Sequence, residues 1–421
     1  MSDENKSKIP LHAPWIERDE VKAVREVLES GNLSTGWQVE EFEREIAEYI
    51  GCTHAVVVSS ATAGLHLALI VAGISPGDEV IMPAFTFPGA ITLPHLLGAK
   101  TVFADVEYNT YTINPKKVEE AVTDKTRAIV PVSPFGLPYD LEAIRHVADK
   151  YGLLVIGDNA GSFGAKYWNQ RLGSAECDLH DSKTGELKRE EGHVVRGKGE
   201  DLSVFSFHAT KVLTTGEGGC VCTENSDWAV QMRMLRDHCS LYRADPEPKK
   251  RFMAVGFNYR MSDIAAALGR VQLAKMDEMI YRRREAASIY TQMLEEYNPA
   301  PRVSTLKTPV GTIPIPEKQY NIVTPYEPEG CFHTFQRYVI YLTFHNAVLV
   351  RNQMRAKGIE VKFGYYNAPD EPVSERLGIY KRCPISRACF HHTVALPIYH
   401  TITREEQQRV VETLAEVLKL S

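Results

Sequence analysis

The most constraining feature of this sequence is a regular alternation between short apolar runs and helical stretches in the first half of the chain. Each apolar run is short enough for a buried strand, and each is followed by a segment with helical periodicity. This order predicts a mostly parallel sheet packed between helices. The predicted strands centre on Val57, Ile81, Val102, Ile129 and Val155, and the helical stretches begin near Thr62, Pro88, Pro115 and Tyr139.

The rest of the chain extends this α/β pattern. A strand at 204–207 and a returning strand at 219–223 add to the sheet. Because the chain has 421 residues, it suits more than one domain. We expect a large domain with an N-terminal helical arm at 1–275 and a smaller C-terminal α/β domain at 276–421. Other predicted elements are helices at about 17–30, 38–50, 228–236, 262–290 and 404–418, strand character at 333–344, and an irregular, proline-rich segment at 299–329.

Composition and charge argue against several classes of function. The chain has 44% hydrophobic residues and a formal net charge of -6, so it lacks the basic footprint of a nucleic-acid-binding protein. No polybasic face or long apolar run indicates a membrane protein, and residues 1–8 do not resemble a signal peptide. The eight cysteines include no C-x-x-C pair, and we expect them to be reduced thiols in a cytoplasmic enzyme.

A polar segment at about 174–200 interrupts the alternation, and we interpret it as an inserted, solvated loop or hairpin. It contains Cys177, Asp178, His180 and His193, whose spacing matches no standard metal site, so we expect no bound metal. Because the segment directly precedes the strand at 204–207, it could reach the mouth of a site there.

One lysine stands directly after the strand at 204–207. Lys211 lies in a loop that ends in the glycines of the segment 216–219, and Ser206 precedes it at the end of the strand. Burial lowers the pKa of an amine and makes it a usable nucleophile near neutral pH. Lys211 therefore suits a Schiff base to an aldehyde cofactor, with Ser206 placed to meet an anion. The alternative is a surface lysine after an edge strand.

A carboxylate occupies the corresponding place on another strand. The apolar run at 153–156 is followed by Gly157 and Asp158, and ligands of open parallel sheets bind at the carboxyl ends of strands. Asp158 could pair with a protonated pyridine nitrogen and so keep the ring an electron sink, as pyridoxal phosphate (PLP) chemistry requires. The alternative is an aspartate that caps a helix or a turn.

A candidate phosphate site follows the strand at 54–58. Small residues at 59–64 open a helix, and Ala61 and Thr62 can offer backbone N–H groups to an anion at the positive end of the helix dipole. Alternatively, Thr62 only caps the helix. No dinucleotide or ATP signature stands between a strand and a helix, so these cofactors are disfavoured.

These segments and several others follow one another in the same order as the matching segments of a known family. From Pro14 to about Thr403 the chain resembles the PLP-dependent sugar aminotransferases of the DegT/StrS type, which have the aspartate aminotransferase fold (fold type I). The further matching segments include Gly77-Asp78-Glu79-Val80-Ile81, Pro83-Ala84-Phe85-Thr86-Phe87, Phe135-Gly136, Gly216-Glu217-Gly218-Gly219 and Gly256-Phe257-Asn258-Tyr259-Arg260-Met261.

The resemblance implies roles for individual positions. Lys211 matches the Schiff-base lysine and Asp158 the partner of the pyridine nitrogen. The phosphate ligands correspond to Ala61, Thr62 and Ser206. Phe87 matches the aromatic residue that stacks on the cofactor ring, although it could equally pack in the core. Asn258 matches an asparagine that reaches the phosphate from the neighbouring subunit, which implies a homodimer with shared sites.

The chain departs from the family pattern in three places, one of which is the polar segment at about 174–200, because it is longer than the usual connection. The family usually carries glutamine or histidine three residues after the aspartate, where this chain has Gly161. The contribution of that side chain beside the ring must come from elsewhere, for instance Asn159 or Ser162, or be absent. Ala61 replaces the usual glycine before Thr62, which is a mild change.

The resemblance implies a transaminase that moves an amino group from glutamate to a keto group of a nucleotide-linked sugar by ping-pong steps. A cyclitol ketone is an alternative acceptor, and a PLP-dependent dehydratase or amino-aromatic-forming enzyme is an alternative activity. Relatives that deoxygenate sugars carry histidine at the position of Lys211, which argues against dehydration. A non-catalytic keto-sugar sensor would not need Lys211 together with Asp158.

A few other residues could take part in a site, but each has a structural explanation that is at least as good. These residues are His208, His391, His392, Arg260 and Arg337.

Overall fold

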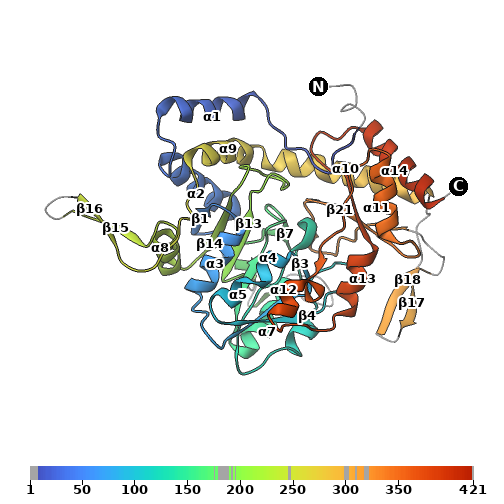
Figure 1. Cartoon of the computed structure of the whole chain (residues 1–421), viewed down its shortest axis with the longest axis horizontal. Helices are drawn as coiled ribbons and strands as arrows, with labels where there is room; N and C mark the ends of the chain where they lie inside the picture. Colours follow the sequence, from blue (N-terminus) through green and yellow to red (C-terminus); the bar gives the residue numbers. More distant parts are fainter. Residues whose placement is uncertain are drawn as a thin grey trace.

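The computed structural model describes residues 8–174, 176–178, 189–190, 193–194, 196–244, 248–297, 303–308, 311–316 and 322–419. Its centre is a seven-stranded sheet flanked by helices, and a second region of helices and short strands lies beside it (Figure 1). In spatial order the strands of the sheet are β1 (His54–Val58), β14 (Gly219–Thr223), β13 (Leu202–Ser206), β6 (Leu154–Asp158), β5 (Thr126–Ile129), β2 (Glu79–Pro83) and β4 (Lys100–Ala104).

The sheet is mostly parallel, as the alternation in the sequence predicts. Strands β13, β6, β5, β2 and β4 pair in parallel, and β14 runs antiparallel to both β13 and β1. Because β14 opposes both of its neighbours, β1 and β13 point the same way, and their carboxyl ends lie at one edge with the end of β6. Each of the seven strands coincides with a run that the sequence predicts.

Helices cover both faces of the sheet, and the alternation of side chains along β1 shows this directly. Val57 packs into a core with Phe42 and Ile46 of α2 (Trp37–Ile50), whereas Val56 and Val58 face the opposite core. Helix α7 (Leu141–Tyr151) belongs to the first core, and α3 (Ala61–Val71) and α8 (Ser226–Leu235) belong to the second. The shorter helices here are α4 (Pro88–Ile91), α5 (Leu93–Leu96) and α6 (Pro115–Glu119).

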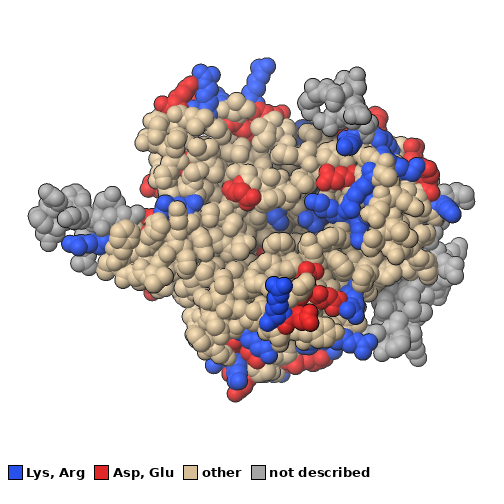
Figure 2. All heavy atoms as spheres, viewed as in Figure 1, with Lys and Arg blue, Asp and Glu red and all other residues tan. Residues whose placement is uncertain are grey.

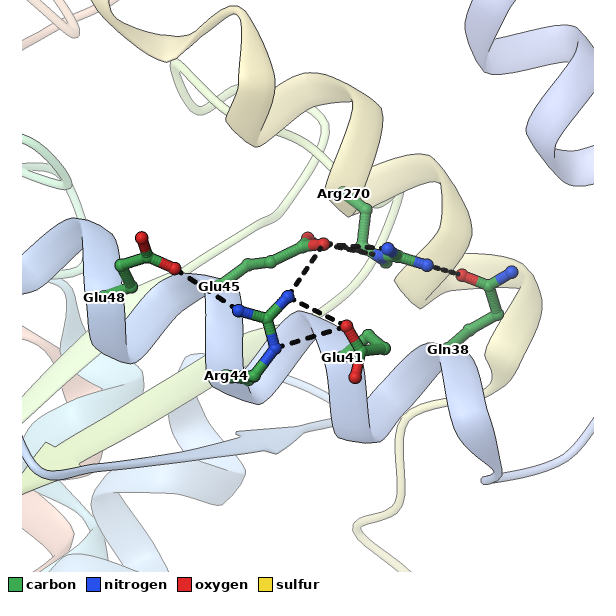
Figure 3. Close-up of polar contacts among 6 residues, drawn as sticks. All are labelled: Gln38, Glu41, Arg44, Glu45, Glu48 and Arg270. Atoms are coloured by element: carbon green, nitrogen blue, oxygen red, sulfur yellow. Dashed lines mark hydrogen bonds and ion pairs between the residues drawn. The ribbon is translucent and has the colours of Figure 1, made fainter.

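The N-terminal arm, α1 (Arg18–Ser30), lies along α9 (Asp263–Ala274), and α9 in turn packs on α2. A charged cluster fastens α9 to α2, as Figure 3 shows: Arg270 donates to Glu45 at 2.8 Å and to Gln38 at 2.7 Å. On the same face of α2, Arg44 contacts Glu41, Glu45 and Glu48. Ion pairs near the protein surface contribute little individually, so the apolar contacts between the two helices carry most of the stability.

The predicted helix at 262–290 was wrong in one respect, because the chain forms two helices there. Helix α9 ends at Ala274, and α10 (Met276–Tyr297) begins after Lys275. The Lys275 ammonium group contacts Glu20 and lies 4.7 Å from the ring centroid of Trp15, so tertiary contacts with the N-terminal arm hold the break. Helical periodicity continues across this position and gave no signal for it.

The second region is built around a small antiparallel sheet of β19 (Ile322–Val323), β21 (Tyr338–Leu342) and β23 (Thr393–Leu396). Its core joins α10 with α11 (Ala347–Ala356) and α14 (Arg404–Leu418), and Ile9 from the N-terminus packs into it. The remaining helices are α12 (Pro372–Arg376) and α13 (Pro384–His392). We propose that the boundary between the large domain and the C-terminal domain lies between residues 275 and 276.

Two sequence-based predictions for this region need correction. Within the strand predicted at 333–344, residues 333–337 form a loop, in which Phe335 has a φ of +47°. The described part of the segment predicted as irregular at 299–329 contains three strands: β17 (Val303–Thr308) and β18 (Gly311–Pro316) pair with each other, and β19 pairs with β21. Proline-rich sequence masked this strand pairing, because proline removes a backbone donor and weakens the strand signal.

Short strands make up the rest of the described structure. Strands β15 (Ser240–Ala244) and β16 (Pro248–Phe252) pair as a hairpin that projects from the body at the left of Figure 1. Within the inserted segment, β9 pairs with β12 and β10 with β11; the side chains of Cys177, Asp178 and His193, and all of His180, lie outside the described residues. The remaining short strands are β3 (Phe85–Thr86), β7 (Lys166–Tyr167), β8 (Gln170–Arg171), β9 (Glu176–Asp178), β10 (Arg189–Glu190), β11 (His193–Val194), β12 (Arg196–Lys198), β20 (Cys331–Phe332) and β22 (Tyr366–Asn367).

The surface carries charges of both signs. Figure 2 shows basic and acidic side chains interspersed on one face, with wide areas of other residues between them. No helix within the described ranges combines the length and the apolar character that a bilayer crossing requires.

Candidate active site

The candidate site lies at the edge of the central sheet where β6, β13 and β1 end. Val204 of β13 pairs with Asp158 of β6, and the N–H of Asn159 donates to the carbonyl of Val204 at 2.9 Å. One strand further, Gly219 of β14 pairs with Ser206 on one side and with Val58 on the other. The sheet therefore brings Asp158, Ser206 and the start of α3 to a single edge, as the sequence predicts.

Backbone hydrogen bonds join the two ends of the loop that carries Lys211. The N–H of Phe207 donates to the carbonyl of Gly218, and the N–H of Ala209 donates to the carbonyl of Gly216, each at 2.9 Å. Gly216 has a φ of +81°, a left-handed conformation that glycine adopts without strain. The glycines that end this segment thus let the loop fold back on the end of β13 and fix the position of Lys211.

Burial and two neighbouring charges set the protonation of the lysine. Burial and, after it, the guanidinium of Arg337 lower the pKa of Lys211, the carboxylate of Asp158 opposes both, and the net result is a pKa of about 8. An amine with this pKa is partly unprotonated at neutral pH, which a nucleophile requires. The expectation of an exposed lysine after an edge strand does not describe this position.

Asp158 is buried, with 5% of its surface exposed. Burial raises the pKa of its carboxyl group, and the N–H of Ala160 at 3.2 Å and the charge of Lys211 counteract this. A desolvated carboxylate is stabilised strongly by a cationic partner. The residue is thus suited to bind a protonated ring nitrogen.

The beginning of α3 forms a cradle for an anion. Ser60 caps the helix by accepting from the N–H of Ala63 at 3.1 Å, and Ala61 and Thr62 stand in its first turn. A Cβ added to Gly219 would lie 2.7 Å from the nitrogen of Ala61, so only glycine allows β14 to approach this closely. Because the first N–H groups of a helix lack partners within it, they are available to a phosphate.

Phe87 and Asn258 are both exposed. Phe87, at the start of α4, is 56% exposed, so its side chain is not a core residue. Asn258 lies on the surface beside Tyr259, whose carbonyl accepts from the N–H of Ser59 at 2.8 Å. Asn258 is therefore accessible to a second subunit. It is followed in sequence by Tyr259, which is hydrogen-bonded to Ser59 just before the cradle.

Asn159 and Ser162, the two residues that the sequence offers in place of the side chain missing at Gly161, are held in a buried polar network. The amide of Asn159 accepts from the hydroxyl of Ser133 at 2.7 Å and donates to the carboxylate of Glu200 at 2.8 Å. Ser162 donates to the carbonyl of Ser133 at 2.7 Å. Burial raises the pKa of Glu200, a residue that the sequence did not single out.

Two side chains of the C-terminal region hold the lysine loop on either side of Lys211. The amide of Gln336 donates to the carbonyl of Thr210 at 2.9 Å, and Nε2 of His400 donates to the carbonyl of Val212 at 3.1 Å. Burial lowers the pKa of His400 to about 2, so its ring is neutral. Sequence reasoning missed both residues, because more than a hundred positions separate each from the loop and no local pattern links them.

Tyr365 is a further aromatic neighbour of the site that the sequence did not indicate. Its ring stacks on Phe135 with a centroid distance of 4.8 Å, and burial raises its pKa to about 12. The charges of Arg337 and Asp158 act on it in opposite directions. The phenol therefore stays neutral at physiological pH.

The other candidates have structural partners. Arg260 forms an ion pair with Asp237 at 2.6 Å, and Arg337 donates to the carbonyl of Gly364 at 2.7 Å. His392 donates to the carbonyl of Leu342 at 2.8 Å, His391 is exposed, and His208 lies 3.0 Å from the hydroxyl of Thr210.

Comparison with known proteins agrees with this geometry. A sequence model of the DegT/DnrJ/EryC1/StrS aminotransferase family matches residues 14–415. The chain belongs to this family. It is 32% identical to the spore coat polysaccharide biosynthesis protein SpsC of Bacillus subtilis, over 98% of this chain and 97% of that protein.

Solved structures of DegT/DnrJ/EryC1/StrS aminotransferases and similar enzymes share the fold. The PLP form of Spr1654 from Streptococcus pneumoniae, provisionally assigned as a sugar aminotransferase, has a TM-score of 0.83 at 24% identity, covering 98% of this chain and 99% of that one. DesV of S. venezuelae, in complex with a ketimine intermediate, has a TM-score of 0.79 at 26% identity, covering 97% and 98%. The chain is thus a fold type I aminotransferase with PLP as its cofactor.

Proposed function

We propose that this aminotransferase moves an amino group from glutamate to the keto group of a nucleotide-linked sugar. The observation that carries the proposal is the pairing of Lys211, with its lowered pKa, and buried Asp158 at the sheet edge that also holds the α3 cradle. The likeness to SpsC, which is named for polysaccharide biosynthesis, supports a sugar as the acceptor. A cyclitol ketone is the alternative acceptor.

Lys211 and Asp158, at the edge of the sheet, have separate roles in this reaction. When bound, PLP supplies an aldehyde that bonds to amines and a ring that draws electrons from the adjacent carbon. The amine of Lys211 would hold the aldehyde until the donor amine displaces it, and the freed amine would then take a proton from the donor carbon and, in the second half of the reaction, give one to the acceptor carbon. The carboxylate of Asp158 holds the proton on the ring nitrogen.

The remaining residues position the cofactor. The N–H groups of Ala61 and Thr62 and the hydroxyl of Ser206 would hold its phosphate, and the exposed Phe87 would contact its ring. Fixing the cofactor at both ends orients the carbon bond that must break, which lowers the entropic part of the barrier. The orphan N–H groups in the first turn of α3 support the phosphate assignment.

We infer further that the working unit is a homodimer in the cytoplasm. The exposure of Asn258 suits a residue that completes the phosphate site of a partner subunit. Cys220, Cys222, Cys383 and Cys389 are buried as free thiols, which suits a reducing compartment.

The donor half of the reaction is tested first. Mixing the PLP-loaded protein with glutamate should bleach the visible band of the bound cofactor, because the amino group is transferred to it. A panel of other amino acids serves as the control. An unchanged band with glutamate, in protein that carries its cofactor, would contradict glutamate as the donor.

The acceptor is tested by a screen of keto-sugar nucleotides and cyclitol ketones with glutamate, read by product mass. The proposal expects a keto-sugar nucleotide product in which the keto oxygen is replaced by an amino group. Loss of water without gain of nitrogen would instead support a PLP-dependent dehydratase. Amination of a cyclitol ketone alone would move the assignment to that acceptor.

A further inference from the structure

Gly161 stands three residues after Asp158, where the family resemblance implies a glutamine or histidine beside the cofactor ring. The backbone there is not left-handed, and a Cβ added to Gly161 would meet its nearest neighbours at an ordinary contact distance of 3.6 Å. Neither strain nor crowding of the main chain therefore requires glycine. One of those neighbours is Oε1 of Gln336, so a longer side chain at 161 would compete with Gln336 for space.

The orientation of the Gln336 amide follows from its other contact. Its nitrogen donates to the carbonyl of Thr210 at 2.9 Å, and a carbonyl oxygen can only accept, so the amide oxygen must face the side of Gly161. Gln336 is 4% exposed, and its Oε1 is buried without a hydrogen-bond partner among the residues that the structure describes. Few buried acceptors in folded proteins lack a partner, and each one calls for an explanation such as a catalytic role or a bound water or ion.

The loop that presents Gln336 is fixed in place. The N–H of Thr334 donates to the carbonyl of Gly136 at 2.9 Å, and the N–H of Arg337 donates to the carbonyl of Phe135 at 3.2 Å. Phe135 and Phe335 both have positive φ values, of 60° and 47°, which such residues adopt only when the surrounding structure holds them. The acceptor is thus preorganised beside Gly161.

We propose that Gln336 supplies, from the C-terminal region, the polar contact to the cofactor ring that Gly161 cannot make. The inference rests on the placement of PLP between Lys211 and Asp158 proposed above. In that placement the aldehyde, the ring nitrogen and the phosphate already have partners. The ring hydroxyl is the polar group that remains, and it can donate a hydrogen bond to Oε1 of Gln336.

This contact has a spectroscopic consequence. An acceptor beside the ring hydroxyl favours its protonated form over the ionised form. The absorption of bound PLP depends on this protonation, so the ratio of its two bands, and its change with pH, report on Gln336 independently of turnover. The same residue also ties the cofactor to the loop of Lys211 through Thr210.

The test compares four proteins: wild type, Gln336→Ala, Gly161→Gln, and the double variant. Titration of the apoproteins with PLP should show about tenfold weaker binding for Gln336→Ala, equivalent to about 1.4 kcal/mol. Gly161→Gln alone should bind PLP no better than wild type, because the new side chain would collide with Gln336. The double variant should regain most of the lost affinity and a wild-type ratio of absorption bands.

Gln407 provides a matched control. It is 1% exposed and donates to the carbonyl of Ala286 at 2.7 Å, in the core of the C-terminal region. Gln407→Ala should lower the unfolding temperature of the apoprotein without changing PLP affinity or absorption. If Gln336→Ala behaves in the same way, Gln336 only supports packing and the inference is wrong.

Borohydride fixation of PLP on the wild-type protein separates this result from the proposed function. If the cofactor is fixed on Lys211 but Gln336→Ala binds PLP as wild type does, the inference alone fails. If no cofactor is fixed on Lys211, the placement of PLP fails and the inference fails with it.

Discussion

At the scale of single residues, the reactivity of the site depends on a balance of three charged groups. Burial and the guanidinium of Arg337 favour the neutral amine of Lys211, whereas the carboxylate of Asp158 favours the protonated amine. The two lowering effects outweigh the raising one, so the amine loses its proton more easily than that of an exposed lysine. The pKa of about 8 reflects this compromise.

The balance predicts how PLP attachment depends on pH. The rate of covalent attachment to the apoprotein should rise about tenfold per pH unit and level off above pH 8, because the neutral amine is the nucleophile. Stopped-flow absorbance measures it. Asp158→Asn should shift the midpoint to lower pH by removing a negative charge, and Arg337→Met should shift it to higher pH. Identical midpoints in all three proteins would contradict this description of the site.

At the scale of elements, the meeting of β14 with α3 builds the phosphate cradle. Gly219 lies between Ser206 and Val58 in the sheet, and its Cα faces the nitrogen of Ala61. A side chain on β14 at this point would push the first turn of α3 away from the sheet edge. The lack of a side chain at one strand residue thus allows the helix terminus to stand at the sheet edge.

Replacing Gly219 therefore tests the cradle. In Gly219→Ala the new Cβ would lie 2.7 Å from a backbone nitrogen, which cannot rotate away. PLP affinity should fall about tenfold or more, equivalent to at least ~1.4 kcal/mol, as measured by titration of the apoprotein. Gly161→Ala, whose Cβ meets only contacts of 3.6 Å, is the control and should bind PLP nearly as wild type does. Equal affinities for both variants would argue against the cradle.

Elements with a strong local pattern could be predicted from the sequence. The seven strands and helices such as α14 appear where apolar periodicity indicates them, and the site residues at strand ends follow from the parallel order. The break at Lys275 could not be predicted, since contacts with Trp15 and Glu20 hold it. The pairing of β17 with β18 was missed for another reason, because prolines weaken the local strand signal.

At the scale of the whole molecule, the C-terminal region completes the site of the large sheet. Gln336 and His400 fasten the lysine loop, and Arg337 tunes the pKa of Lys211. These contacts join distant parts of the sequence and could not be predicted without the tertiary structure. Asn258, by contrast, was assigned through the family resemblance alone, and its partner subunit remains a prediction.

Shared sites predict complementation between two inactive variants. Lys211→Ala and Asn258→Ala homodimers should each lose activity, but a mixed dimer would hold one site with both residues intact. Unfolding the two variants together and refolding them should restore roughly a quarter of wild-type activity, because half of the randomly formed dimers are mixed. The variants refolded separately and then combined are the control. No recovery, in mixed dimers confirmed by mass, would show that Asn258 acts within its own subunit.

The central claim is that the amine of Lys211 carries the cofactor. Treating the PLP-loaded protein with borohydride converts the bond between amine and aldehyde into a stable one, and peptide mass spectrometry then locates it. The account predicts a single modified peptide that contains Lys211, and no such peptide from Lys211→Ala. Cofactor fixed on another lysine, or on none, would contradict it.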